Sequence, residues 1–214
     1  MGMKFTKVAS DAFEKLTLNA GILCRTFNPE TATIGDIIAA TTGGITFSEN
    51  PTYTDFGEDV DNVPANTKQL LRITAYDPVI SGTQLTLDDE SIAELVGGAD
   101  IGSESEAGVK KITPRSVLKT SDFKDVWFVI DYSDVNTGES AGFVAIHLKN
   151  SLNRTGFQLQ TGKNSKGQDT FEYHGHYDIT DEDQTPPFEV YIKKGTEEGT
   201  EGTEGTEGTE GTEG

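Results

Sequence analysis

Two histidines spaced by two, with acidic residues at the same spacing, are the side chains best suited to chemistry. Alternate side chains of a β-strand point to one face, which would bring together Glu172, His174, His176 and Asp178. Imidazole and carboxylate groups are common ligands of zinc and related metals. The intervening positions are just as regular, and they favour a core strand whose polar face is solvated: Phe171, Tyr173, Gly175, Tyr177 and Ile179. We therefore expect no metal here.

Other acidic groups resemble cation or acid–base sites only loosely. Asp178, Asp181 and Asp183 lack the glycine and the closing glutamate of an EF-hand loop. The carboxylates at positions 55, 58, 59 and 61 could pair as in glycoside hydrolases. Because 36 of the 214 residues are Asp or Glu, such a grouping carries little information, and a solvated or interface loop is the better interpretation.

Cys24, the only cysteine, alternates with apolar residues, which favours a buried thiol over a nucleophile. The sequence contains no phosphate-binding loop, dinucleotide fingerprint, Gly-x-Ser-x-Gly or Cys-x-x-Cys motif. We therefore expect a protein that is not an enzyme, with no catalytic residue, cofactor or metal.

The charge of the chain is strongly negative, with a formal net charge of −19. Seven of the 36 acidic residues lie in residues 195–214, so residues 1–194 carry 29 acids against 17 Lys and Arg, a net charge of −12. Nucleic-acid affinity comes mainly from Lys and Arg contacts to phosphate, so this surface should repel DNA. Repulsion is itself useful where DNA must slide past without binding.

Cysteine content and hydropathy limit the class of protein. A single cysteine cannot form an intrachain disulfide, which excludes a disulfide-stapled secreted module. The first 15 residues lack the apolar region of a signal peptide, and no stretch approaches the roughly 20 apolar residues that cross a bilayer. We expect a soluble protein made in a cytoplasm, without a membrane partner.

A period of two dominates the sequence and predicts a mainly β fold. Residues 126–132 and 143–148 should form one hairpin, and residues 156–161 and 170–179 a second. The run around Trp127 is apolar on both faces, which predicts a strand covered on both sides. Further strands are expected at 16–24, 68–76, 79–87 and 188–192, with turns or irregularities at Asp77-Pro78 and Ser81-Gly82.

One α-helix is predicted at residues 89–96, with Asp88 as N-cap and Gly97-Gly98 as the stop. Its apolar stripe requires a sheet to cover. Residues 34–40 fit a helix or a strand equally well. Residues 48–66 and 97–113 lack a regular pattern, and loops this long tend to be functional or flexible.

The chain divides into an N-terminal arm (1–15), a β domain (16–194) and a tail (195–214). The tail is almost a pure Gly-Thr-Glu repeat. It has no proline and too few triplets for a collagen helix, and nothing in it can be buried to offset chain entropy. We expect the tail to be disordered.

The order of several segments resembles the major tail tube proteins of long-tailed bacteriophages. The resemblance covers roughly residues 5 to 194. The segments that carry it are Thr42-Gly43-Gly44-Ile45-Thr46-Phe47, residues 53–61, 64–68, 122–126, 146–152 and 171–178, and Pro187-Phe188-Glu189.

The resemblance implies a β-sandwich or barrel-like tail tube fold with one flanking helix. It also implies stacked hexameric rings, in which four-stranded sheets join edge to edge around a lumen that conducts DNA without specific binding. Other phage tail proteins would contact the tube ends, and the protein would belong to the virion, assembled in the bacterial cytoplasm. The loop at 48–66 would reach the adjacent ring, which makes its polar and aromatic residues the contact candidates: Tyr53, Asp55, Phe56, Glu58, Asp59 and Asp61.

Two other functions remain open from the sequence. A β-sandwich that recognises carbohydrate or a host surface would gather its aromatic residues in one exposed groove: Tyr53, Phe56, Tyr132 and Tyr173. An enzyme would need a pocket where two carboxylates, or the histidine pair, converge.

Overall fold

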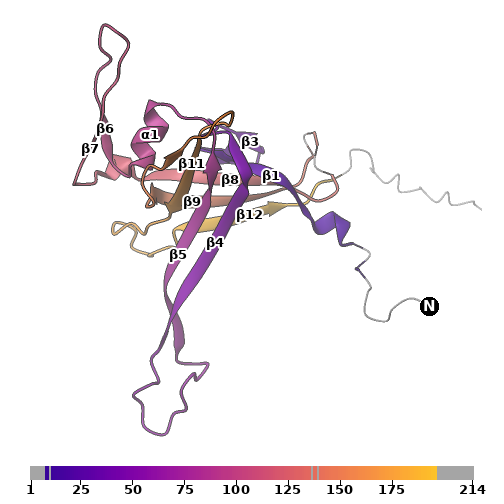
Figure 1. Ribbon diagram of the computed structural model, residues 1–214. Coiled ribbons are helices and arrows are strands. Elements are labelled where there is room, and N and C mark those ends of the chain that lie inside the picture. Colours follow the sequence, from indigo (N-terminus) through magenta and orange to yellow (C-terminus); the bar gives the residue numbers. More distant parts are fainter. Residues whose placement is uncertain (1–7, 10, 136, 139, 197–214) are drawn as a thin grey trace, which may run out of the picture.

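The computed structural model describes residues 8–9, 11–135, 137–138 and 140–196 (Figure 1). The expectations for the first seven residues of the N-terminal arm, and for the Gly-Thr-Glu repeat beyond residue 196, lie outside these residues. The described end of the N-terminal arm contains the 3₁₀ turn η1 (Phe13–Lys15), and Lys194 pairs with Glu14 there at 2.5 Å.

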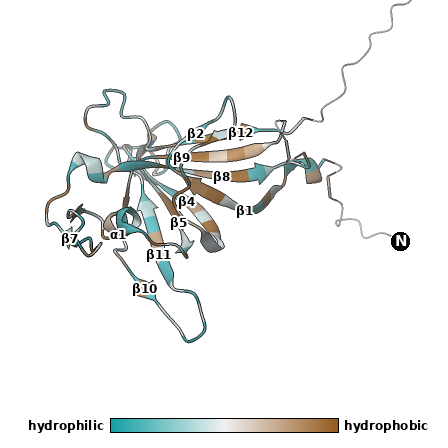
Figure 2. Cartoon of the chain, turned by 90° about the horizontal axis from the view of Figure 1, so that it is seen from above, coloured by the Kyte–Doolittle hydropathy of each residue, from teal (hydrophilic) through white to brown (hydrophobic). Residues whose placement is uncertain are grey.

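A four-stranded antiparallel sheet forms one layer, in the order β1-β8-β9-β12. Its strands are β1 (Thr17–Cys24), β8 (Lys124–Tyr132), β9 (Phe143–Asn153) and β12 (Phe188–Lys193). The β8–β9 hairpin is the one predicted from the sequence. Hydrophobic residues concentrate on β8 and β9 at the centre of this sheet (Figure 2).

The second layer contains β4 (Thr41–Asp55), β5 (Leu71–Gln84), β10 (Leu159–Gln160) and β11 (Gln168–His174). β11 lies between β5 and the short β10, and the last residues of β9 also pair with β11. β9 therefore leaves the first sheet and joins the second, so one chain of hydrogen bonds links both layers. The sheets stay open, and the predicted mainly β, sandwich-like fold class is confirmed.

The main core lies between the layers. Phe171 on β11 is almost fully buried opposite Gly82 on β5, where a Cβ would approach the Phe171 ring to 2.9 Å. Each buried aliphatic or aromatic side chain contributes about 1.5–3 kcal/mol by leaving water. The cluster comprises Leu23, Ile80, Leu95, Val126, Phe128, Ile146, Leu148, Phe171 and Tyr173.

A smaller core covers the outer face of the four-stranded sheet. The segment with β2 (Phe27–Asn28) and β3 (Thr33–Ile34) folds back over it, and Phe27 packs at 5.7 Å from Trp127 between ring centroids. The prediction that the Trp127 strand is covered on both faces is confirmed. Residues 34–40 form neither of the two expected regular elements beyond Ile34, apart from an isolated bridge between Ile37 and Cys24.

Helix α1 (Asp89–Leu95) begins and ends almost as predicted. Asp88 accepts a hydrogen bond from the Ser91 backbone N–H at 2.7 Å, and the Ser91 hydroxyl caps Asp88 in return. Leu95 carries the apolar stripe into the core, and Gly97 follows with a φ of 84°. No helix in the described residues is long and apolar enough to cross a bilayer.

Four expectations about strand limits are wrong. β1 does not alternate regularly, because a bulge between Leu18 and Ile22 shifts its register. β5 runs without a break through Asp77-Pro78 and Ser81-Gly82, since β4 pairs along its whole length. β11 ends at His174, where Gly175 lies too close to Leu148 and Pro187 for a side chain. The segment 97–113 contains most of a short hairpin, β6 (Ala99–Ile101) with β7 (Ile112–Pro114), next to the 3₁₀ turn η2 (Thr120–Asp122).

The burial of Cys24 gives a direct chemical test of this core. Burial raises the pKa of the Cys24 thiol to about 11, and the thiolate is the reactive species. We expect iodoacetamide at pH 8 to leave Cys24 unmodified in the folded protein and to alkylate it fully in 8 M urea, as mass spectrometry would show. Rapid alkylation without urea would contradict the packing described here.

Candidate assembly surface

The β4–β5 hairpin extends far beyond the sandwich (Figure 1). We call residues 51–76 the arm, which is distinct from the N-terminal arm at residues 1–15. Antiparallel pairing continues along it from Pro51↔Tyr76 to Asp55↔Leu71. The prediction that residues 48–66 form an irregular loop is therefore wrong in its first half, because residues 48–55 belong to β4, and the loop proper spans 56–70.

The arm carries an apolar face that nothing in the described chain covers. Phe47 on β4, opposite Ile80, faces the core, and Phe188 of the other sheet packs against Phe47 at 5.6 Å. Side chains two apart on a strand share a face, and a register shift in β5 brings Ile73 opposite Tyr53, so this row of β4 continues past the sandwich to Tyr53. There it has no second sheet to meet, and Tyr53 and Ile73 are 55% and 44% exposed.

The arm's tip is an ordered turn rather than a loose loop. Asp55 accepts hydrogen bonds from the backbone N–H groups of Gly57 at 2.8 Å and Asn66 at 2.7 Å. Two further backbone bonds close turns at Val60 and Val63. Asp55 is half-buried by these contacts, so it holds the tip together and is a weaker contact candidate than the sequence suggested.

The remaining candidates are all exposed, Tyr53 on the paired part of the arm and the other four at the tip, where Val60 joins them. Phe56 and Val60 present apolar side chains, while Glu58, Asp59 and Asp61 present carboxylates. Among the described residues, none of these three carboxylates forms an ion pair. The structure thus brings five of the six predicted contact residues to the uncovered part of the arm, and it adds Leu71 and Ile73 from the strand expected at 68–76.

Open sheet edges are the second feature of this surface. In the described chain β12 pairs only with β9, β4 only with β5, and β1 only with β8 apart from the bridge at Cys24. β12 also exposes Val190 and Ile192. An exposed strand edge is a template for pairing with another chain, so these edges favour self-association.

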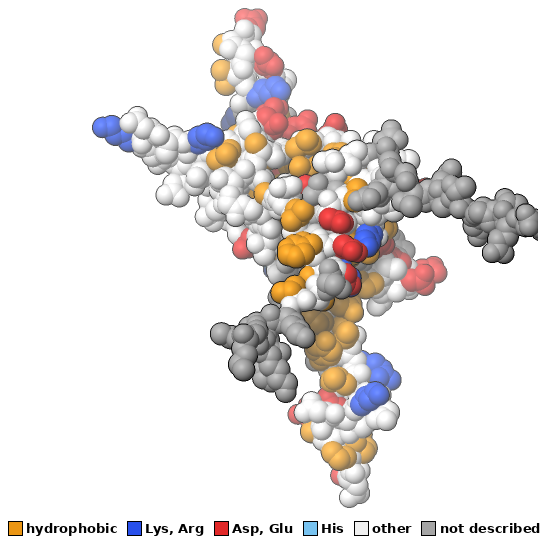
Figure 3. Space-filling model, turned by 90° about the vertical axis from the view of Figure 1, so that its right-hand side faces the viewer, with side chains coloured by type: hydrophobic (Ala, Val, Ile, Leu, Met, Phe, Trp, Pro, Cys, Tyr) orange, Lys and Arg blue, Asp and Glu red, His pale blue; other side chains and the backbone are white. Residues whose placement is uncertain are grey.

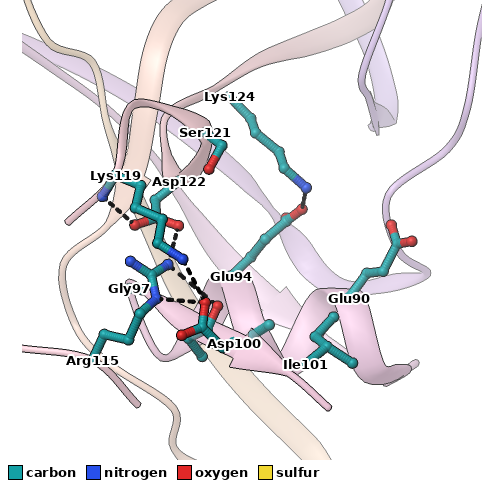
Figure 4. Close-up of a pocket in the computed structure, with 13 residues that line it drawn as sticks. Glu90, Glu94, Gly97, Asp100, Ile101, Arg115, Lys119, Ser121, Asp122 and Lys124 are labelled. Carbon is teal, nitrogen blue, oxygen red and sulfur yellow. Dashed lines mark hydrogen bonds and ion pairs between the residues drawn. The ribbon is translucent and has the colours of Figure 1, made fainter. Parts of the chain in front are cut away.

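A hollow of about 380 Å³ lies between α1, the β6–β7 hairpin and η2 (Figure 4). Its cations are already paired. Arg115 lies 3.0 Å from Asp100 and 2.5 Å from Asp122, Lys119 lies 2.8 Å from Asp100, and Lys124 contacts Glu94 at 2.5 Å. Burial raises the pKa of Asp122, but the hydrogen bonds from Arg115 and from the Lys119 backbone outweigh burial and lower it. These pairs tie the β6–β7 hairpin to the segment with η2, and helix α1 to β8.

The histidine pair does not converge on a site. His174 lies 3.0 Å from Asp77, whereas His176 lies beyond the end of β11 and its Nδ1 is 3.0 Å from the Asn150 carbonyl oxygen. The predicted core face also stops there, since Ile179 is fully exposed. Within the described residues, no three His, Cys, Asp or Glu side chains come together as metal ligands.

The other candidate groups serve local structure. Asp178 accepts hydrogen bonds from Thr180, and Asp181 from Asp183 and Thr185, so both close turns. His147 stacks on Trp127 at 4.0 Å between ring centroids, and its Nε2 lies 3.0 Å from Asp125.

The aromatics of a possible carbohydrate site are dispersed. Tyr173 is buried in the main core, Tyr53 and Phe56 lie on the arm, and Tyr132 ends β8. The single groove that a carbohydrate-binding module would need is therefore not formed by these four residues.

No protein-family model matches this chain, and no curated protein is similar enough in sequence to count as a relative.

Proposed function

We propose that this chain is a structural protein that polymerises, and that it is a tail tube subunit of a long-tailed phage. The observation that carries the proposal is the arm. A paired hairpin that projects with an uncovered apolar face is unfavourable in a monomer, because soluble monomers rarely expose large contiguous apolar patches. Contact with a neighbouring copy would bury that face.

The four-stranded sheet supports the formation of a closed ring in such an assembly. Its outer strands, β1 and β12, each have a free edge along most or all of their length. Copies that join edge to edge remove those free edges when the ring closes. The exposed Val190 and Ile192 beside the β12 edge would be covered in the same contact.

The arm supports the stacking of rings into a filament. It corresponds to the loop that the family resemblance assigns to contact between rings, and it projects away from the four-stranded sheet (Figure 1). A head-to-tail contact between unlike surfaces does not close, so it generates a filament. A net charge of −12 outside the tail repeat suits a conduit through which DNA passes without binding.

Sedimentation velocity over a wide range of protein concentration tests this proposal. We expect discrete oligomers at low concentration and steadily larger species at high concentration, because the stacking contact does not saturate. A single monomer boundary at every concentration would refute self-assembly as the function.

A further inference from the structure

The charges of the arm indicate which surface of a second copy receives it, an inference that rests on the proposed function. Three hairpins project from the sandwich: the arm and the β6–β7 hairpin (Figure 1), and the β10–β11 hairpin (Figure 2). The loop at the arm tip, residues 56–70, holds three acids, Glu58, Asp59 and Asp61, against one cation, Lys68, and none of the four forms an ion pair among the described residues. A surface that binds this tip should therefore be basic. Such a surface stands out in a chain whose net charge is −19.

The β10–β11 hairpin has that character. Residues 156–168 contain Lys163 and Lys166 and no Asp or Glu. We call residues 161–167 the basic tip. A hydrogen bond from the Ser165 N–H to the Gly162 carbonyl, with Asn164 at a φ of 58°, closes the turn. Both lysines are exposed, and neither forms an ion pair with the rest of the described chain.

Apolar side chains flank both tips. Phe56 and Val60 lie beside the acids of the arm, Leu159 lies on β10, which leads to the basic tip, and Phe157 lies just before β10, all four exposed. Each surface therefore offers a charged end next to apolar area, the combination that typifies a protein contact with a polar rim.

The β6–β7 hairpin lacks this complementarity. Glu104 and Glu106 lie at its tip, and of the two lysines that follow, Lys110 already pairs with Asp89 at 2.8 Å. An acidic arm would meet like charge there, which opposes association.

We propose that the arm of one copy docks on the β10–β11 hairpin of a second copy, with Glu58, Asp59 and Asp61 facing Lys163 and Lys166. The two hairpins leave the sandwich in different directions (Figures 1 and 2), which appear as separate projections in Figure 3, so they meet only between molecules. The contact joins unlike surfaces and therefore propagates from copy to copy. Exposed ion pairs are weak singly and screened by salt, so this contact sets register and partner, while the apolar side chains supply most of the affinity.

Charge reversal tests the contact. The first variant carries Glu58→Lys, Asp59→Lys and Asp61→Lys, and the second carries Lys163→Glu and Lys166→Glu. At low salt we expect each variant alone to self-associate about tenfold or more weakly than the unaltered protein, because like charges then face each other. An equimolar mixture should recover association, since each altered surface meets its opposite. Sedimentation velocity measures all three samples.

The first variant separates docking from general repulsion. It reduces the formal net charge from −19 to −13, so nonspecific repulsion alone would predict tighter association, whereas docking predicts weaker association. A control with Glu104→Lys and Glu106→Lys, at the β6–β7 tip, should associate at least as well as the unaltered protein. If the unaltered protein assembles but both variants assemble equally well, or if their mixture stays dissociated, the docking inference fails while the proposed function stands. If the unaltered protein never assembles, the proposed function fails as well.

Discussion

Replacing residues 53–74 by Asn-Gly is expected to abolish growth beyond the smallest oligomers while the sandwich still folds. The replacement joins the paired residues Thr52 and Ala75 through a two-residue turn that suits a hairpin. Both core clusters lie outside the removed segment, so the domain loses no buried apolar contact. It loses the uncovered face of the arm and the acidic tip, which are the proposed contacts between rings.

Sedimentation velocity and circular dichroism would be measured on this variant together. The expected result is a β spectrum with a near-normal melting temperature and no large species at any concentration. A milder variant, Tyr53→Thr with Ile73→Thr, keeps the arm and its strand propensity but removes the apolar face, and it should weaken association in the same direction. If the chain without the arm still forms full-sized assemblies, the arm is not the contact between rings.

Substituting Phe171→Ala is expected to produce the largest loss of stability from a single change, about 3–5 kcal/mol. The Phe171 ring fills the space above Gly82 on the neighbouring strand and lies 5.3 Å from the Tyr173 ring. Its removal leaves a cavity that Gly82 cannot fill. Because β11 joins β5 to the end of β9, the cavity weakens the link between the two layers.

The matched control is Phe157→Ala, the same chemical change at an exposed position. Surface substitutions usually alter stability by less than about 0.5 kcal/mol. Urea unfolding, followed by tryptophan fluorescence at a concentration that keeps both variants monomeric, gives the two free energies of unfolding. Similar values for the two variants would contradict the position of Phe171 at the centre of the core.

The sequence predicted the sandwich well where local signals agreed with tertiary contacts. The β8–β9 hairpin has β-branched and aromatic strands around a polar turn, and helix α1 has a cap, a stripe and a glycine stop, so these elements form as expected. The fold class follows from the same period-two pattern. Such elements depend on neighbouring residues, which a sequence displays directly.

The arm and the end of β11 depended on contacts that a sequence does not display. Pro51 and the acidic run after it suggested a loop, but pairing with β5 keeps residues 48–55 extended. The alternation from Phe171 to Ile179 suggested one long strand, but Gly175 lies against Leu148 and Pro187, and the chain leaves the sheet there.

The basic tip was overlooked in the sequence, although a signal for it exists. Residues 156–168 form a stretch without a single acid in a chain where acids outnumber bases about two to one. Likewise, the apolar positions Leu71 and Ile73 were visible as a strand face, but only the projection of the arm shows that no second sheet covers them.

Negative-stain electron microscopy of the purified full-length protein, over a range of concentrations at low salt, tests the proposed self-assembly most directly. We expect rings, with the six-fold symmetry that the family resemblance implies, and tubes of variable length at higher concentration, because open strand edges close the ring and the arm continues the stack. Uniform particles of monomer size at every concentration would contradict it.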